Sequence, residues 1–295
     1  MWHPFSKHRR IKVEEHKGYI PMVMDSMPTS RDLLIKMVAD TQRVVEQRKE
    51  EVPLAGMRAL ASMQRKPYDL SSTIKNDPGI SLIAQVKRTS PDMETPIQNY
   101  DPVILAKRFE MSGVTALAVA TNQKYYRGGI DDLTLVTQNV GIPVIRDDFV
   151  YDEYQIVEAR AAGADAVLLI AALLDSHRLW NLISITQRNR MTAVVQVQSE
   201  EEVRDVIAFE PRVIVISNRD MRTFEADLNT THRLRDLIPP HIVALSMGWL
   251  RTAQDVEYVV QAGIDGIVVG QALLTAPDTH EAIAELFRLT GSAKF

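Results

Sequence analysis

The sequence predicts an α/β protein in which eight parallel strands close into a (β/α)8 barrel. Short apolar runs rich in Val, Ile and Ala recur from Ser81 onward, which is typical of strands buried on both faces of a parallel sheet. A helix-like segment follows each run, so that eight strand–helix units occupy residues 81–295. Eight such units are the count of a TIM barrel, whereas a doubly wound sheet usually has fewer strands.

The strands and helices alternate, with turn residues where one element gives way to the next. Gly113, Gly163 and Gly263 follow helical segments, and glycine is the commonest residue to end a helix. Pro143 opens a strand, where its missing N–H is tolerated. The expected strands are 82–87, 115–120, 143–147, 165–170, 192–197, 212–217, 241–246 and 265–269. The expected helices are 101–112, 130–139, 152–162, 174–188, 199–208, 228–237, 252–262 and 278–289.

Two segments precede the barrel. Residues 1–29 are basic and have no apolar period, so we expect an irregular N-terminal arm. The arm is either a solvated tail or a docking segment for a protein partner. Residues 30–80 are expected to form an N-terminal helical extension. Its elements are a long helix over 31–51, a shorter helix over Leu54–Met63 and a connecting loop over Pro67–Gly79.

The composition excludes several classes of protein. A net charge of -4 and a pI near 6.0 argue against a general nucleic-acid binder. The absence of cysteine excludes disulfides and thiolate chemistry, and the 7 histidines show no metal-ligand spacing, so no metal and no cofactor is predicted. No apolar run approaches the ~20 residues of a membrane span. We therefore expect a protein of the cytoplasm, or of an organelle stroma in a eukaryote, that does not bind membranes.

Polar side chains gather where the predicted strands end, which is the ligand-binding end of a barrel. In the stretch SLIAQVKRTSP (81–91), Gln85 and Lys87 share one face of the first strand. Polar groups inside a barrel are costly unless they face a ligand, so we expect Lys87 to point into the mouth rather than to reach solvent. Arg219, after the sixth strand, is expected to do the same. Further candidates at strand ends are Tyr126, Asp147, Gln196, Ser217, Ser246 and Met247.

Two turns suggest a site for a phosphorylated small molecule. Ser246-Met247-Gly248 and Val269-Gly270-Gln271 follow the last two strands, where barrels commonly present backbone N–H groups to phosphate. Gly248 and Gly270 allow the backbone to approach an anion closely, and Ser90 could add a hydroxyl. The alternative is that these are ordinary tight turns.

The chain resembles the indole-3-glycerol phosphate synthases along most of its length. The matching passages are LIAQVKRTSP (82–91), ATNQKYYRGGIDDL (120–133), PVIRDDFVYDEYQIVEARAAGADAVLLIAALL (143–174), VISNRDMRTFEADLNTT (215–231) and GIDGIVVGQALL (263–274). The resemblance implies a lyase of tryptophan biosynthesis that closes an indole ring with loss of carbon dioxide and water. Such a reaction needs an acid to protonate the substrate carbonyl, a base to remove a proton and an acid to expel the hydroxyl.

The sequence departs from this family pattern at the acid–base positions. The first-strand lysine is kept as Lys87, but the glutamate two places before it is Gln85. The lysine that ends the third strand is Asp147, and the fifth-strand glutamate is Gln196. The sixth-strand asparagine is Ser217, with Arg219 kept, and the seventh-strand Glu-Ser-Gly is Ser246-Met247-Gly248.

These departures leave two hypotheses. Glutamine cannot exchange a proton near neutral pH, and each lost acid or base typically costs ~10²- to 10⁴-fold in rate. The first hypothesis is therefore a divergent member without normal synthase activity, which keeps a partial anion site and serves as a ligand-binding or protein-interaction subunit. The alternative is an active carbon–carbon lyase acting on 1-(2-carboxyphenylamino)-1-deoxyribulose 5-phosphate or a related sugar phosphate. In that rewired site Lys87 is the acid and Asp147 the base.

Overall fold

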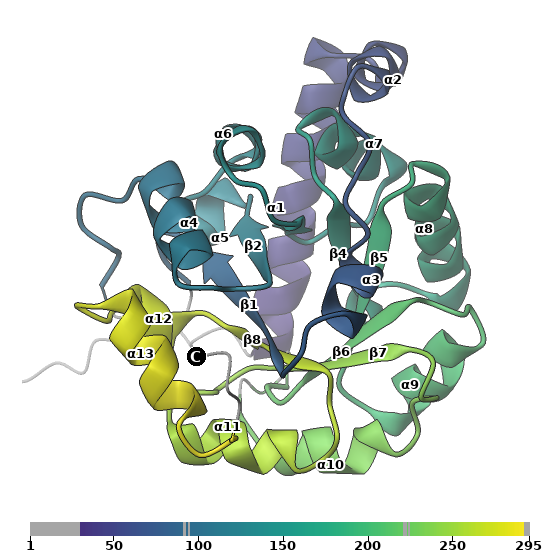
Figure 1. Ribbon diagram of the computed structural model, residues 1–295. Helices are drawn as coiled ribbons and strands as arrows, with labels where there is room; N and C mark the ends of the chain where they lie inside the picture. Colours follow the sequence, from purple (N-terminus) through teal and green to yellow (C-terminus); the bar gives the residue numbers. More distant parts are fainter. Residues whose placement is uncertain (1–29, 91–92, 94, 221–222, 224, 292–295) are drawn as a thin grey trace, which may run out of the picture.

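A computed structural model describes residues 30–90, 93, 95–220, 223 and 225–291. The basic arm predicted over residues 1–29 lies outside these residues. Eight parallel strands form a closed barrel in sequence order, and the last strand pairs with the first (Figure 1). The strands are β1 (Ser81–Val86), β2 (Ala116–Ala120), β3 (Val144–Asp147), β4 (Ala166–Ile170), β5 (Thr192–Val197), β6 (Val213–Ser217), β7 (Val243–Met247) and β8 (Gly266–Val269). The predicted (β/α)8 barrel is confirmed.

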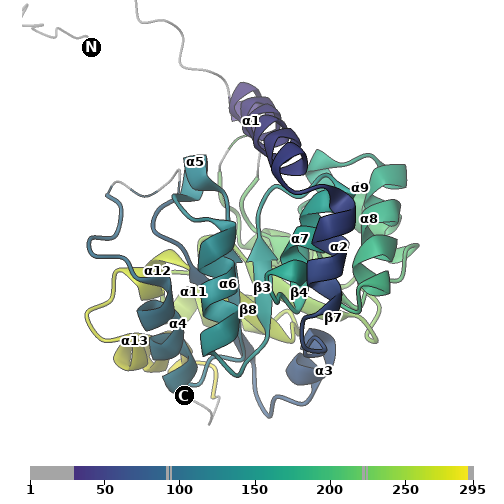
Figure 2. The same ribbon diagram turned by 90° about the horizontal axis from the view of Figure 1, so that it is seen from above.

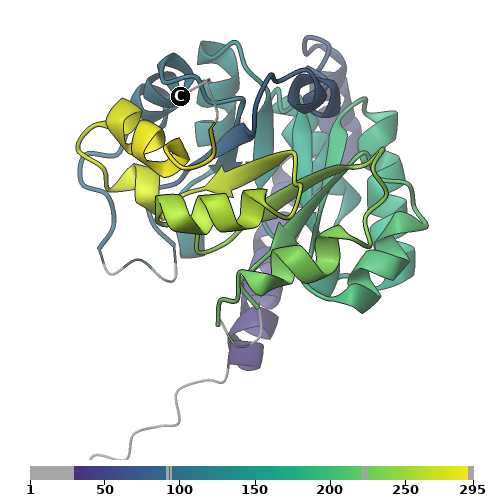
Figure 3. The same ribbon diagram turned by 60° about the horizontal axis from the view of Figure 1, so that its bottom comes forward.

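A ring of helices surrounds the strands. The closure of this ring brings the yellow C-terminal elements beside the blue β1 (Figure 3). The main helices are α4 (Pro102–Met111), α6 (Ile130–Asn139), α7 (Glu153–Ala161), α8 (Ser176–Arg188), α9 (Glu200–Ile207), α10 (Asn229–Arg235), α11 (Ala253–Val260) and α13 (Thr279–Phe287). The short helices α5 (Gln123–Tyr126), η1 (Ala171–Leu173) and α12 (Gln271–Leu274) lie in loops after the strands.

The apolar core has two layers, because each strand is buried on both faces. Side chains pointing outward, such as Leu82, Val119 and Ile216, pack under the ring of helices. Side chains pointing inward fill the barrel itself, as in other barrels of this size. The inward-facing set includes Ile83, Ala118, Ile145, Leu168, Val194, Val215 and Leu245. The barrel is therefore a packed core, apart from a small cavity of about 20 Å³ that inner side chains such as Ile83, Val194 and Leu245 line.

Three N-terminal helices precede the barrel, and two of them cover its ends. They are α1 (Ser30–Glu51), α2 (Leu54–Ser62) and α3 (Leu70–Lys75). Met37 of α1 joins the inner core from the side where the strands end, and it lines the cavity there. In Figure 2, α2 lies beside α7 and α8 along the side of the barrel, whereas α1 lies at the end of the barrel away from α3. This arrangement places α1 at the barrel mouth.

The loop predicted over Pro67–Gly79 is wrong, because this segment contains helix α3. Asp69 caps the helix by accepting a hydrogen bond from the Ser72 backbone N–H at 3.1 Å. Leu70 and Ile74 are buried in the inner core. Lys75 donates to the His241 backbone carbonyl at 2.6 Å, ahead of β7. The helix therefore plugs the end of the barrel opposite the mouth.

A buried ionic cluster fastens α1 and α7 to β3. Arg146 points outward from β3 and is fully buried. Its guanidinium pairs with Glu158 of α7 at 2.8 Å and with Asp148 at 3.1 Å. Arg48 of α1 adds a third contact, to Glu158 at 3.2 Å. The sequence analysis gave these residues no structural role, and the structure shows that they hold α1 over the mouth.

Candidate active site

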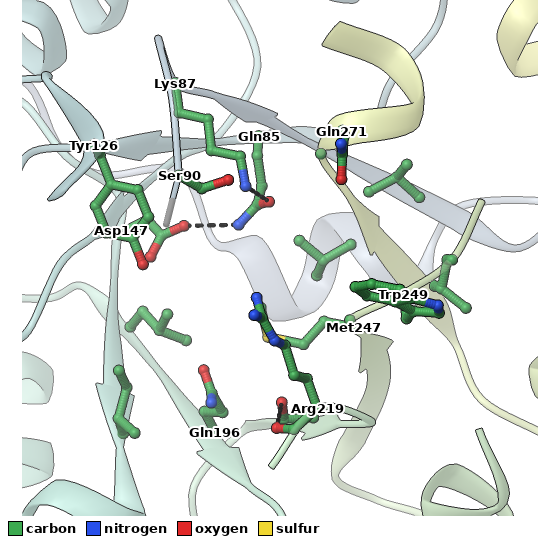
Figure 4. Close-up of a pocket in the computed structure, with 18 of the residues that line it drawn as sticks. Gln85, Lys87, Ser90, Tyr126, Asp147, Gln196, Arg219, Met247, Trp249 and Gln271 are labelled. Carbon is green, nitrogen blue, oxygen red and sulfur yellow. Dashed lines mark hydrogen bonds between the residues drawn. The ribbon is translucent and has the colours of Figure 1, made fainter. Parts of the chain in front are cut away.

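The ends of the strands enclose a cavity of about 150 Å³ at the barrel mouth (Figure 4). It holds nearly all of the residues proposed from the sequence. They are Gln85, Lys87, Ser90, Tyr126, Asp147, Gln196, Ser217, Arg219, Met247, Gly248, Gly270 and Gln271. Parallel strands all end on the same side of the barrel, so residues spread over 187 positions, from 85 to 271, meet in one site.

Three polar side chains form a hydrogen-bonded chain across the mouth. The Lys87 Nζ donates to Gln85 Oε1 at 3.0 Å. The Gln85 Nε2 donates to Asp147 Oδ2 at 2.9 Å. The glutamine amide thus has one orientation that satisfies both neighbours, with its oxygen toward the ammonium and its nitrogen toward the carboxylate. A cation and an anion are linked through a neutral amide.

The carboxyl group of Asp147 is buried, and burial makes its charged form less favourable. Burial raises the pKa of Asp147 above its ordinary value, and Asp148 acts in the same direction. Lys87 and the Gln85 hydrogen bond oppose the shift without cancelling it. A carboxyl group with a raised pKa is suited to accepting a proton near neutral pH.

Gly270 allows this chain of side chains to pack against β8. A Cβ added to Gly270 would lie 2.3 Å from Gln85 Oε1 and 3.1 Å from Lys87 Nζ. No real Cβ makes a contact as short as the first, so a larger residue would displace the glutamine. Close packing against Gln85 and Lys87 therefore explains why position 270 is a glycine, whether or not an anion binds there.

The remaining polar groups lie around the same cavity. The Ser90 Oγ is buried and has no hydrogen-bond partner among the described residues. Gly248 has a φ of +90°, and a Cβ there would lie 3.2 Å from the Arg219 backbone nitrogen. This close approach brings the turn after β7 against the turn after β6. A buried hydroxyl without a partner costs free energy unless a ligand or water satisfies it.

Ser246 does not belong to the site, contrary to the sequence prediction. It is fully buried, accepts a hydrogen bond from Asn218 Nδ2 at 2.9 Å and lies 2.7 Å from Thr231 Oγ1. Side chains alternate along a strand, and Leu245 of β7 faces the inner core. Met247 is therefore the residue that β7 contributes to the mouth, opposite Ser217 of β6. Of the two β7 candidates, Met247 lines the cavity and Ser246 does not.

Sequence reasoning missed residues that line the cavity beyond β7. Trp249 has a φ of +65°, a conformation that is unusual for a bulky side chain. The Arg251 guanidinium stacks on its ring at 3.5 Å and donates to Gln271 Oε1 at 3.4 Å. Strained residues concentrate at ligand sites. The available signal was an aromatic residue one place after Gly248 and an arginine three places after it.

Neither a metal cluster nor a membrane helix is found in the described part of the chain. No group of three or more His, Asp or Glu side chains there could hold a metal ion. No described helix is long and apolar enough to cross a membrane.

Two solved structures share the fold at low sequence identity. One is thiamine phosphate pyrophosphorylase from Pyrococcus furiosus, with a TM-score of 0.55 and 16% identity over 75% of this chain and 96% of that chain. The other is orotidine 5'-phosphate decarboxylase from Pyrococcus horikoshii, with a TM-score of 0.51 and 17% identity over 68% of this chain and 94% of that chain. At these identities the likeness concerns the barrel alone.

Sequence comparison gives a more specific result. The family model for indole-3-glycerol phosphate synthase matches residues 34–286. The synthase of Rippkaea orientalis is 37% identical, over 91% of this chain and 94% of the relative. The synthase of Roseiflexus sp. is 36% identical, over 86% of this chain and 98% of the relative. The synthase of Dehalococcoides mccartyi strain CBDB1 is 33% identical, over 86% of this chain and 99% of the relative.

These matches contradict the first hypothesis drawn from the sequence. That hypothesis expected a divergent barrel without normal synthase activity, acting as a ligand-binding or protein-interaction subunit. The relatives that match almost end to end carry the name of the enzyme. The alternative, an active lyase with a rewired site, agrees better with them.

Proposed function

Because the chain belongs to the indole-3-glycerol phosphate synthase family, we propose that it catalyses the family's ring closure with a rearranged set of acid–base groups. The substrate is 1-(2-carboxyphenylamino)-1-deoxyribulose 5-phosphate, and the products are indole-3-glycerol phosphate, carbon dioxide and water. The observation that carries this proposal is the linked Lys87–Gln85–Asp147 chain in the mouth. It supplies a proton donor and a proton acceptor without the replaced family residues.

Lys87 is the proposed general acid. The residue is 8% exposed, and its side chain lines the cavity. Protonation of the substrate's ketone oxygen makes the carbonyl carbon electrophilic, and the ring carbon that bears the carboxylate attacks it. The carboxylate then leaves as carbon dioxide, and its bonding electrons restore the aromatic ring. Proton donation by a positioned group is the type of assistance that this first step requires.

Asp147 is the proposed base. Lys87 takes up a proton from solvent and donates it to the hydroxyl formed in the first step, which leaves as water. The double bond of the five-membered ring forms when a proton leaves the carbon next to the amine nitrogen. Asp147 accepts that proton, and its raised pKa favours this role. Gln85 positions both groups and takes no proton itself.

The phosphate of the substrate is proposed to bind where β7 and β8 end. Ser90 offers a buried hydroxyl without a partner, Gly248 and Gly270 bring backbone close to the cavity, and Arg219 contributes a cation. Leu168, Ile170 and Val268 form an apolar wall suited to the substrate's aromatic ring. Arg251 adds a second cation, held beside Gln271.

The test is a product assay on the purified chain. The carboxyphenylamino-deoxyribulose phosphate is added, and indole fluorescence is followed together with the carbon dioxide released. We expect the two products in equal amounts. Carbon dioxide without the indole signal would point to a different sugar-phosphate reaction, and the absence of both would refute the proposal.

A further inference from the structure

A second cavity lies outside the barrel, between α2 and the pair α7 and α8. Its volume is about 490 Å³, and it shares no lining residue with the mouth. Figure 2 shows α2, α7 and α8 side by side. The segment after α2 forms part of the wall, and residues 188–190 at the C-terminal end of α8 form another part. We call it the α2–α7 cavity.

The lining of the α2–α7 cavity is strongly cationic. One carboxylate lines it, that of Glu153, and this group pairs with Arg58 at 2.5 Å. None of the side chains of Lys66, Arg188 and Arg190 forms an ion pair with another residue in the described ranges. The cationic lining residues are Arg58, Lys66, Arg160, Arg188 and Arg190. Such a concentration is unexpected on a chain whose net charge is -4, because unpaired like charges repel one another.

Arg160 forms the inner wall of the cavity and is only partly satisfied. Its Nη2 donates to the backbone carbonyls of Gln64, at 3.1 Å, and Arg65. Its Nη1 is buried and has no hydrogen-bond partner within the described part of the chain. The side chain as a whole is 7% exposed. A buried guanidinium nitrogen without an acceptor is rare in folded proteins.

Cationic neighbours make the charged form of Arg160 less favourable. Burial lowers the pKa of Arg160, and the nearby Arg65 and Arg190 lower it further, against the effect of Asp165. An anion in the cavity would relieve this repulsion. Arginine recognises phosphate and carboxylate groups with paired, charge-assisted hydrogen bonds.

We propose that the α2–α7 cavity binds a small polyanion that carries phosphate or carboxylate groups. Arg160, Arg188 and Arg190 hold it, with Lys66 at the rim. The five cationic side chains and the single carboxylate around the cavity favour a small anion over an apolar ligand. Because α2 forms one wall and α7 the other, the ligand bridges the N-terminal extension and the barrel. The proposal is independent of the reaction at the mouth.

The test uses inorganic pyrophosphate and citrate as probes on the full chain. Calorimetric titration and thermal melting are performed at constant ionic strength. The variant is Arg188→Gln with Arg190→Gln, since both side chains are exposed and the fold does not depend on them. The matched control is Arg204→Gln on α9, which is also exposed. Arg160 is left unchanged because it holds the backbone after α2.

We expect saturable binding and a higher melting temperature for the wild type and the control. In the double variant the affinity should fall at least about tenfold, because two charge-assisted contacts are removed. Its synthase turnover should not change. A response to pyrophosphate alone would identify a phosphate site, and a response to citrate would extend it to carboxylates.

Anion binding at the mouth must be distinguished from binding in the α2–α7 cavity, because cationic side chains line the mouth as well. The titration is therefore repeated with Arg219→Gln. Binding that disappears in this variant and persists in the double variant would place the anion in the mouth and overturn the proposal. Equal responses of the double variant and the Arg204→Gln control, or no binding of either probe at millimolar concentration, would overturn it as well.

Discussion

Gln85 donates its side-chain amide to the Asp147 carboxylate at 2.9 Å, across the mouth from β1 to β3. In the family pattern these two positions hold a glutamate and a lysine, so both charges differ in this chain. A glutamate at position 85 would repel Asp147, whereas a glutamine offers it a hydrogen-bond donor. The two substitutions are therefore compatible as a pair. They leave Lys87 as the cation linked to this pair.

Replacement of Asp147 by asparagine tests the proposed base. Asp147→Asn keeps an oxygen that can accept the Gln85 amide, but it removes the group that accepts a proton. We expect kcat for indole formation to fall by about 10²- to 10⁴-fold with an unchanged fold. Circular dichroism provides the control for folding. A variant with wild-type kcat would exclude Asp147 as the base.

The same variant should alter the pH dependence of stability. Burial raises the pKa of Asp147 above its ordinary value of 3.8, so the ionised form is less favourable in the folded state. The resulting loss of stability is absent below pH 3.8. It reaches its full size above the raised pKa that the group has in the folded state. Asp147→Asn should therefore melt above the wild type at neutral pH, and the difference should shrink as the pH falls towards 4. A difference independent of pH would contradict this account.

Gly270→Ala tests the geometry of the hydrogen-bonded chain. The new methyl group would overlap Gln85 Oε1, which lies at the end of a side chain that can rotate away. We expect little change in melting temperature but a loss of activity of ten-fold or more, on the order of that caused by small misplacements in active sites. Gly141→Ala on the surface is a matched control, with its nearest contact at 3.4 Å. Equal activity of the two variants would show that Gln85 is not needed in this position.

Glu158→Gln tests the ionic cluster that holds α1. The change leaves the fully buried Arg146 with a weaker partner and removes the contact of Arg48. Loss of one partner from a buried ion pair typically destabilises a protein by about 3–5 kcal/mol. Denaturant unfolding should show a loss of this size. Glu285→Gln, whose pair with Arg288 is exposed, should have little effect, and similar losses for both would refute a special role of the cluster.

The barrel could be predicted from the sequence because its signal is repeated. Runs such as Val213–Ser217 are apolar on both faces, and helix-ending glycines such as Gly163 recur between them. Helix α3 was missed because it has six residues, too few to show a helical period between Pro67 and Gly79. Its helical state depends on burial of Leu70 and Ile74 under the barrel, which local sequence does not reveal.

Only part of the site was predicted, and the parts that were found lie at the ends of strands with a clear apolar pattern. The strand ends that carry Lys87 and Asp147 were located correctly, since both follow clear apolar runs. At β7 both Ser246 and Met247 were named as candidates, but only Met247 lines the cavity, because neighbouring residues of a strand point to opposite faces. The contacts of Arg146 with Glu158 join distant segments, and no local pattern predicts them.

The turnover of Lys87→Met, measured beside the wild type and Lys107→Met, tests the central claim most directly. Lys107 lies exposed on α4 and serves as the matched control. If Lys87 is the acid, the wild type and the control should form indole-3-glycerol phosphate at the same rate, and Lys87→Met should be about 10²- to 10⁴-fold slower. Equal rates for all three proteins, or no product from the wild type, would contradict the account.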